Sequence, residues 1–363
     1  MEAINHRFLS DPIHYYFYLY ITFSFSMRSN QVTIKDIARE LGISPSTVSR
    51  ALKDHPDISS QTKKAVNQLA KNLSYQPNAI ALSLKHSKSF TLGIIIPETV
   101  HYFFSTVISG IEDVAYDTGY KVMICQSNER YDRELANSQM LYSNRVDGLL
   151  VSLAKETRNF DHLKFIQDNN IPVVFFDRGV EAFPCDRVLI DDYSAAYKAT
   201  NYLIERGHRK LIHLAATQNL KIGLDRYRGF SDALKDHSLE PLPNNMFLAD
   251  KFESAYETIE KLVEENNLPD GIFAVNDLTA MGAMMALKKH HVRIPEDIGI
   301  IGFGGGREAI LTDPQLSTID QNGYEMGRTA ANLLLERIES DDELFEPELK
   351  IIDTKLIVRG STR

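Results

Sequence analysis

Apolar residues recur at helical spacing in three short stretches near the start of the chain. Thr33, Ser44 and either Ser59 or Ser60 stand where N-cap residues are expected, and Gly42 separates the first stretch from the second. The apolar positions follow intervals of three and four residues: Ile34, Ile37, Ala38 and Leu41, then Val48, Ala51 and Leu52, and finally Ala65, Val66, Leu69, Ala70 and Leu73. We therefore predict three short helices that share one small core.

From residue 90 onward the pattern changes to short apolar runs that alternate with amphipathic stretches. Residues 106–118 and 194–206 have helical periodicity. Eight runs are typical of buried strands: TLGIIIP, YKVMICQ, DGLLVSL, PVVFFD, RVLID, KLIHLAA, GIFAVND and IGIIGF. Alternation of this kind predicts βαβ units and doubly wound parallel sheets, so the expected fold class is α/β behind a small all-α domain.

Charge is distributed unevenly along the 363 residues. The whole chain has a formal net charge of -9, yet residues 28–88 carry +6 and the residues after them carry -14. A basic segment attached to an acidic body is expected when only that segment binds a polyanion such as DNA. The two cysteines, Cys125 and Cys185, have no metal-ligand spacing, so we expect no metal, no disulfide scaffold and a reducing cytoplasm.

Residues 1–26 contain the aromatic run PIHYYFYLYITFSFSM. Its apolar part, residues 13–25, is too short to span a bilayer, and no signal-peptide cleavage site follows it. We therefore expect no membrane partner and interpret residues 1–26 as a non-native or disordered extension, with Met27 as the working first residue.

The second predicted helix has an exposed polar start, as in a helix-turn-helix domain whose second helix enters the major groove. Arg50 can bind guanine bidentately, Ser46 can reach a base edge or a phosphate, and Pro45 offers apolar contact. Ser49 also faces outward, and Thr33 and Thr47 suit phosphate contacts. The alternative is an ordinary solvated face on a small helical bundle.

The segment YQPNAIALSLKHSKS follows the third helix. Asn78 can cap a short helix at 79–84, which is too short to persist unless it packs against something. We expect it to fold when it pairs with its twin from a second subunit over DNA, with Leu84 wedged into the minor groove. An ordinary interdomain helix is the alternative.

These residues resemble a known family. VTIKDIARELGISPSTVSRAL followed by YQPNAIALSLK is similar to the DNA-binding headpiece and hinge of the lactose-repressor (LacI/GalR) family of bacterial transcription regulators. The resemblance implies that Pro45, Ser46 and Arg50 read bases, and that Leu84 is the family's leucine lever with Lys85 beside it. The implied organisation is a DNA-binding domain at 27–76, a hinge at 77–89 and an effector-binding, dimerising core at 90–363.

Candidate ligand contacts follow the predicted strands, because ligands of open α/β sheets bind at the carboxyl ends of the strands. Aromatic rings beside Asn, Asp and Arg suit a sugar, whose hydroxyls need donors and acceptors. Two alternatives to ligand binding remain open. Phe103 and Phe104 could simply pack in the core, and Asp177 could cap a helix. The candidates are Phe103, Phe104, Gln126, Ser127, Asp177, Arg178, Asp191, Arg226, Asn276, Asp277 and the glycines after Phe303, of which the first is Gly304.

Residues 90–340 resemble the effector core of the same family, which is related to periplasmic sugar-binding proteins. RVDG, ERGHRKLIHLA, RYRGF, VND, IPEDIGIIGF and PQLSTIDQ match its running pattern. The resemblance implies two subdomains joined by three crossovers, one of about 90–190 and 319–347 and the other of about 191–318 and 348–363. It also implies that Arg226 contacts the ligand beside a polar wall at Asn276 and Asp277. Gly304 stands where the family has a sugar-binding Asp, which puts a standard sugar mode in question.

The sequence thus predicts a dimeric repressor of carbohydrate-utilisation genes. It would bind double-stranded operator DNA under the control of a small effector, which we expect to be a sugar or sugar derivative. A core that responds to a protein corepressor is the first alternative, and a secreted sugar-binding protein or sugar enzyme is the second. No nucleophile or metalloprotease motif is present, and GFGGG lacks the order of a phosphate-binding loop, so neither catalysis nor a cofactor is expected.

Overall fold

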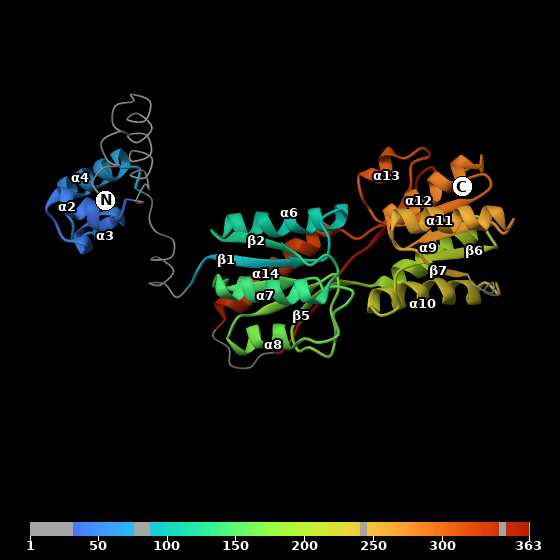
Figure 1. Cartoon of the computed structure of the whole chain (residues 1–363), viewed down its shortest axis with the longest axis horizontal. Coiled ribbons are helices and arrows are strands. Elements are labelled where there is room, and N and C mark those ends of the chain that lie inside the picture. Colours follow the sequence, from blue (N-terminus) through green and yellow to red (C-terminus); the bar gives the residue numbers. More distant parts are fainter. Residues whose placement is uncertain (1–31, 76–87, 240–244, 341–345, 363) are drawn as a thin grey trace, which may run out of the picture. The chain divides into compact units, whose positions relative to one another are not determined.

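The computed structural model describes residues 32–75, 88–239, 245–340 and 346–362 (Figure 1). The chain divides into two compact units, Met1–Ser87 and Lys88–Arg363, and each unit is described by itself. Asn78, Leu84, Lys85 and the extension at 1–26 lie outside the described residues.

The three helices predicted for the first unit are confirmed: α2 (Ile34–Leu41), α3 (Pro45–Leu52) and α4 (Ser60–Asn72). Ser59 is the N-cap of α4, and its hydroxyl accepts from the Thr62 amide at 3.2 Å. Ile37, Val48 and Val66, one from each helix, are fully buried together. We call residues 33–75 the headpiece.

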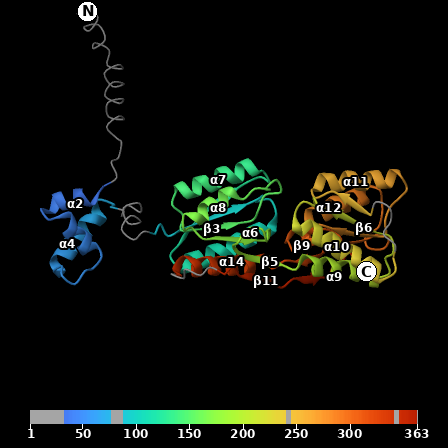
Figure 2. The same cartoon turned by 90° about the horizontal axis from the view of Figure 1, so that it is seen from below.

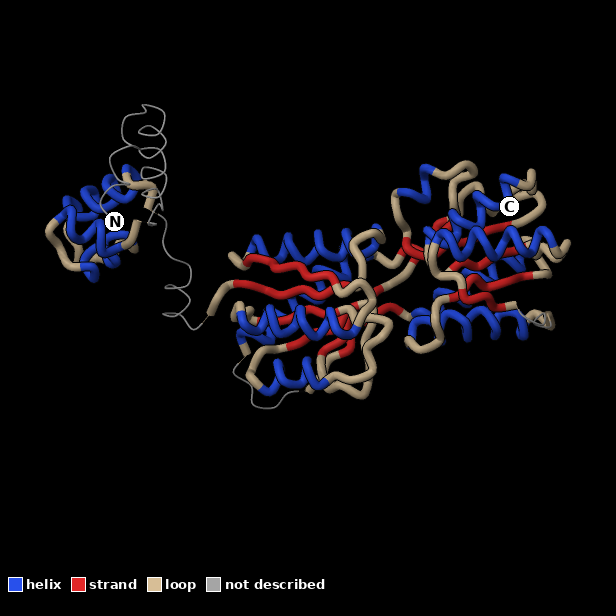
Figure 3. Tube along the Cα trace, in the orientation of Figure 1, coloured by secondary structure: helices blue, strands red, loops and turns tan. Residues whose placement is uncertain are grey.

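The second unit contains two six-stranded sheets, with strand orders β11-β5-β4-β3-β1-β2 and β12-β10-β9-β8-β6-β7 (Figure 3). Neighbouring strands are parallel except that β12 is antiparallel to β10. The first sheet contains β1 (Thr91–Ile96), β2 (Lys121–Gln126), β3 (Gly148–Val151), β4 (Val173–Phe176), β5 (Asp186–Ile190) and β11 (Leu349–Ile352). The second contains β6 (Leu211–Ala215), β7 (Met246–Leu248), β8 (Gly271–Ala274), β9 (Gly299–Gly304), β10 (Ser317–Asp320) and β12 (Lys355–Ile357).

Helices cover both faces of each sheet, which confirms the doubly wound class (Figure 2). On the first sheet, α6 (Tyr102–Asp117) and α14 (Gly323–Glu339) lie on one face, and α7 (Tyr131–Ser143) and α8 (Asp161–Asp168) on the other. On the second sheet, α9 (Asp192–Glu205) and α10 (Lys221–Asp236) lie opposite α11 (Phe252–Glu264) and α12 (Asp277–Lys289), and the short α13 (Glu308–Leu311) follows β9. None of the helices in these described ranges has the length and apolar character needed to cross a bilayer.

The chain passes between the two sheets three times, after β5, after β10 and after β11. The predicted boundaries of the two subdomains are wrong at two places. The prediction places 348–363 in the second subdomain, but strand β11 pairs with β5 in the first sheet. It places 319–320 in the first subdomain, but these residues belong to β10 of the second sheet. The reason is tertiary: α14 packs on the first sheet and returns the chain to its edge, and no local signal in LKII specifies that partner.

Candidate functional site

Helix α3 presents the outward face that the sequence predicts. Ser44 caps it by accepting a hydrogen bond from the Thr47 amide at 3.1 Å, and Pro45 occupies the first helical position. Val48 anchors the helix in the headpiece core, whereas Arg50 is exposed. Gly42 turns the chain between α2 and α3 in the left-handed region, at φ 63°. Pro45, Ser46 and Arg50 are therefore exposed together, with Thr47 and Ser49 half-buried beside them.

The predicted DNA contacts differ in how free their side chains are. The Thr33 hydroxyl donates to Asp36 at 2.6 Å, and the hydroxyls of Ser46 and Thr47 lie 2.7 and 2.8 Å from the Ser44 hydroxyl. Among the described residues, none forms a hydrogen bond or ion pair with the Arg50 guanidinium. Arg50 is thus the side chain of this face whose donors are open to a partner, while the hydroxyls must exchange a local bond first.

A cavity of about 90 Å³ lies between the two subdomains of the second unit, at the carboxyl ends of the strands. Nine predicted contacts line it: Phe103, Phe104, Asp177, Arg178, Arg226, Asn276, Asp277, Gly304 and Gly306. Gln126 does not line the cavity, because β2 is an edge strand. Its side-chain oxygen instead accepts a hydrogen bond from the Thr99 hydroxyl. Ser127 donates to the Ile96 carbonyl at 3.3 Å, and Asp191 caps α9, so neither lines the cavity.

Several protein groups hold the Arg226 side chain in the cavity wall. Its guanidinium donates to Asp192 at 2.7 Å and to the Val275 carbonyl at 2.7 Å, with Gln321 at 3.4 Å. It also stacks 3.6 Å from the centre of the Phe303 ring. Burial raises the pKa of Asp192 to about 6, although the Arg226 charge opposes this rise. The arginine is therefore held as a fixed, oriented donor at the back of the cavity.

Asp177 and Arg178 face the cavity from the first subdomain. Asp177 has a left-handed backbone (φ 60°) directly after β4 and caps no described helix, so its predicted alternative role is absent there. Ser152 donates to its carboxylate at 3.2 Å, and burial raises its pKa. Arg178 donates to both Glu129 oxygens, at 2.8 and 3.0 Å. Burial acts to raise the pKa of Glu129, but the charges of Arg178 and Lys155 hold it below its usual value.

The second subdomain supplies Asn276 and Asp277 at the start of α12. The Asn276 side chain caps the helix by accepting from the Thr279 amide at 2.8 Å. Asp277 accepts from the Thr318 hydroxyl at 2.6 Å and the Gly306 amide at 3.0 Å, and burial raises its pKa to about 6. The loop after β9 therefore folds against Asp277.

Phe103 and Phe104 line the cavity but also belong to the apolar core under α6, so the core alternative holds for most of their surface. Sequence reasoning missed several further lining residues: His101, Glu129, Lys155, Asp250, Glu308 and Gln321. Glu129 lies three positions after β2 and Lys155 four positions after β3, so a wider window after each strand would have included them.

Two family models match the chain. The model described as bacterial regulatory proteins, lacI family, matches residues 33–78, and the one described as periplasmic binding proteins and sugar binding domain of LacI family matches residues 89–358. The chain belongs to the LacI family. The second match alone covers most of the chain, and it includes the residues that line the cavity.

Relatives of this LacI-family chain match it in sequence or in fold over most of its length. The HTH-type transcriptional repressor PurR of Actinobacillus pleuropneumoniae serotype 3 is 32% identical over 333 residues, which cover 91% of this chain and 98% of that protein. The lac repressor dimer bound to operator has a TM-score of 0.81 at 21% identity, covering 92% of this chain and 99% of that one, and shares the fold. A LacI family regulator from Enterococcus faecium with bound ribose has a TM-score of 0.67 at 26% identity, covering 75% and 98%.

These matches, together with the headpiece and the cavity, give the class of the protein. This LacI-family chain is a DNA-binding transcriptional repressor with an effector-binding core, and it is not an enzyme.

Proposed function

We propose that the chain acts as a cytoplasmic homodimer that represses carbohydrate-utilisation genes from a pseudo-palindromic operator, and that a sugar or sugar derivative in the cavity controls its affinity for that operator. The observation that carries the ligand class is the surplus of acceptors in the cavity. A related regulator that holds ribose adds support.

The cavity lining carries more carboxylates than cations. Lys155, Arg178 and Arg226 each already form an ion pair with a carboxylate. The lining carboxylates are Glu129, Asp177, Asp250, Asp277 and Glu308. A ligand that fits this lining is rich in hydrogen-bond donors, because the carboxylates of the lining outnumber its cations and would repel an added phosphate or carboxylate. We therefore favour a neutral or amino sugar over an acidic or phosphorylated one.

Glu308 is our proposed acceptor in place of the aspartate that Gly304 replaces. Gly304 has φ 148°, a backbone conformation that favours glycine, and a Cβ there would lie 3.1 Å from Asp277 Oδ2. Glu308 lines the same cavity, and a Cβ on Gly306 would lie 2.2 Å from its carboxylate. None of the described residues forms a hydrogen bond or ion pair with the Glu308 side chain, so its oxygens are open to a ligand hydroxyl.

Titration calorimetry with a ligand panel tests this proposal. The panel contains neutral sugars, amino sugars, sugar phosphates and purine bases, and we expect heat from a neutral or amino sugar. Glu308→Gln should weaken the binding of that sugar, because an amide oxygen accepts a hydrogen bond from a hydroxyl less strongly than a carboxylate does. Heat from sugar phosphates or purines alone would contradict the ligand class, and silence across the panel would support the protein-corepressor alternative.

The DNA half of the proposal rests on Arg50. Arg50→Ala should reduce discrimination between operator and a single-base variant by about 1–3 kcal/mol, because one bidentate base contact is lost. Arg39→Ala is the matched control, since Arg39 lies on α2, pairs with Asp36 at 3.2 Å and is also exposed to solvent. Filter binding to operator DNA selected from random sequence measures both, and equal effects of the two substitutions would contradict the assignment.

A further inference from the structure

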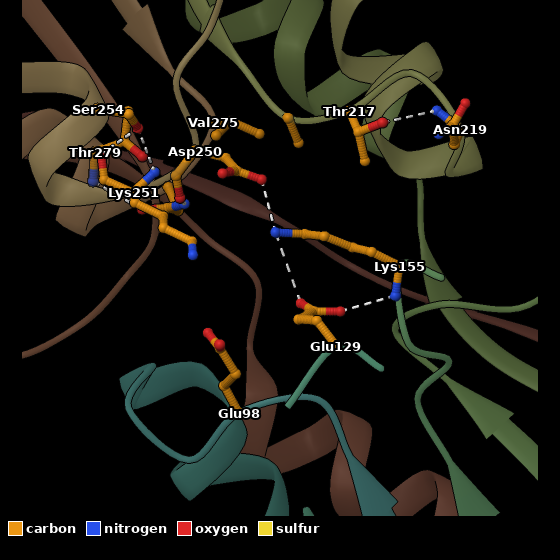
Figure 4. Close-up of polar contacts among 12 residues, drawn as sticks. Glu98, Glu129, Lys155, Thr217, Asn219, Asp250, Lys251, Ser254, Val275 and Thr279 are labelled. Atoms are coloured by element: carbon orange, nitrogen blue, oxygen red, sulfur yellow. Dashed lines mark hydrogen bonds and ion pairs between the residues drawn. The ribbon is translucent and has the colours of Figure 1, made fainter. Parts of the chain in front are cut away.

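One ion pair joins the two subdomains across the cavity (Figure 4). Lys155 follows β3 of the first sheet and Asp250 follows β7 of the second, and Lys155 Nζ lies 2.6 Å from Asp250 Oδ2. Both side chains line the cavity. Among the ion pairs of the described residues, no other links the two subdomains across the cavity. Opening of the cavity therefore requires this contact to break.

The loop that carries Lys155 is fixed on both sides. The Lys155 amide donates to Glu129 at 2.8 Å, as Figure 4 shows, and the Ala154 amide donates to Glu134 at 2.7 Å. Glu134 is completely buried and also accepts from the Thr157 hydroxyl at 2.8 Å. A fixed loop leaves only the lysine side chain to be ordered, which lowers the entropic cost of the contact.

The opposite loop is also anchored. The Asp250 carbonyl accepts from the Asn276 side chain at 3.0 Å, and that side chain caps α12. Asp250 is thus tied to the helix that carries Asp277 of the cavity wall. A displacement of this wall by a ligand would move Asp250 with it.

Lys155 has a second partner within its own subdomain. Its ammonium lies 3.7 Å from Glu129 Oε1, so the charge stays partnered when Asp250 moves away. Both members of the cross-cavity pair keep about a quarter of their side-chain surface exposed, so water can solvate Asp250 after separation. These two features make the pair breakable at a small cost, which a deeply buried pair would not be.

The cavity is lined from both subdomains, with Lys155 and Asp177 on one side and Arg226 and Asp277 on the other. Separation of the subdomains would therefore remove one wall of the site from a bound ligand. The contact that holds the two walls together thus bears directly on ligand entry and release.

We propose that the Lys155–Asp250 pair is a latch across the effector cavity. It stabilises the closed arrangement without ligand, and it opens by transfer of the Lys155 ammonium from Asp250 to Glu129. The latch would set the rate of ligand exchange and the balance between the two arrangements that the headpieces sense. This inference rests on the proposed role of the cavity as the effector site, but it concerns the ligand-free protein.

Distances between spin labels on the two subdomains test the latch directly. Lys164→Cys on α8 and Glu257→Cys on α11 place labels at exposed positions of the full chain, while the native Cys125 and Cys185 are buried and remain unlabelled. Pulsed electron resonance without ligand then gives the ratio of open to closed molecules. Lys155→Met and Asp250→Asn should each raise that ratio about three- to tenfold, and the double variant should add little to either.

The controls separate the latch from general destabilisation. Lys289→Met removes a pair of equal length, 2.6 Å to Glu260, that lies within one subdomain, and it should leave the distances unchanged. Lys155→Arg keeps the charge and should keep the closed population. Unchanged distances in both latch variants, or an equal shift in Lys289→Met, would overturn the proposal. The ligand panel tests the effector class separately, because the distances are measured with no ligand.

Discussion

The Arg226→Met substitution is expected to destabilise the core by about 3–5 kcal/mol, the usual cost of removing one partner of a buried ion pair. Both members of the pair are about 6% exposed, and Arg226 Nε lies 2.7 Å from Asp192 Oδ1. The substitution leaves the Asp192 carboxylate and the Val275 carbonyl without their donor, and it also removes the stack on Phe303. We do not add these contributions, because they share one side chain.

The loss of stability caused by Arg226→Met should grow with pH. Burial raises the pKa of Asp192 to about 6 in the native protein, so the folded state binds more protons than the unfolded state between about pH 4 and 6. Stability from this group is highest at low pH and falls as the pH rises through that window. Without Arg226, the pKa of Asp192 in the folded state rises further, and the fall in stability extends to higher pH. The variant should therefore lose more unfolding free energy, relative to the parent protein, at pH 8 than at pH 5.

Urea unfolding followed by circular dichroism measures this, since the chain has no tryptophan. Asp192→Asn combined with Arg226→Met should be more stable than Arg226→Met alone, because the unpaired buried charge is gone. Arg293→Met is the control: its pair with Asp297 lies at the surface, where solvent screens it, and its removal should change the stability little. A loss below about 1 kcal/mol for Arg226→Met, with no pH dependence, would refute the reasoning.

Two further substitutions test the local arguments. Gly42→Ala should lower the stability of the headpiece by about 1 kcal/mol, because a residue with a Cβ is strained at φ 63°. No atom lies within 4 Å of the new Cβ, so backbone strain is the whole effect. Faster hydrogen exchange in the headpiece would record it, whereas unchanged exchange would contradict the turn assignment. Asp277→Asn should flatten the fall in unfolding free energy between about pH 4 and pH 6, since burial raises the pKa of Asp277 to about 6 and the folded state binds more protons than the unfolded state in that window. An identical pH profile in the variant would show that Asp277 does not contribute to it.

The helices and most strands could be predicted because their signals are local. Thr33 and Ser44 stand at the predicted N-cap positions, and each of the eight apolar runs overlaps a strand. The strands that escaped prediction are β7, β10, β11 and β12, of which three are edge strands of three or four residues. A short edge strand has one neighbour, and its side chains are half-exposed, so its pattern differs little from that of a loop.

The site was predictable only where its residues adjoin strands. Asp177, Arg178 and Asp277 were found by this rule, and Arg226 was singled out by the family resemblance. Lys155 and Asp250 meet through the approach of two loops that are 95 positions apart in sequence, which no periodicity encodes. Gln126 satisfies the same rule but is the last residue of the edge strand β2, so its position in the sheet, rather than its residue type, keeps it out of the cavity.

The central claim is that specific DNA binding by the headpiece is coupled to a ligand in the core. The most direct measurement is selection of bound DNA from random sequence by the full chain, followed by affinity measurements on the selected DNA with and without each panel sugar. We predict a pseudo-palindromic site whose affinity depends steeply on salt and changes about 5- to 150-fold with one neutral or amino sugar, the range typical of allosteric coupling. Equal affinity for selected and random DNA, or a selected site that no ligand affects, would contradict the account.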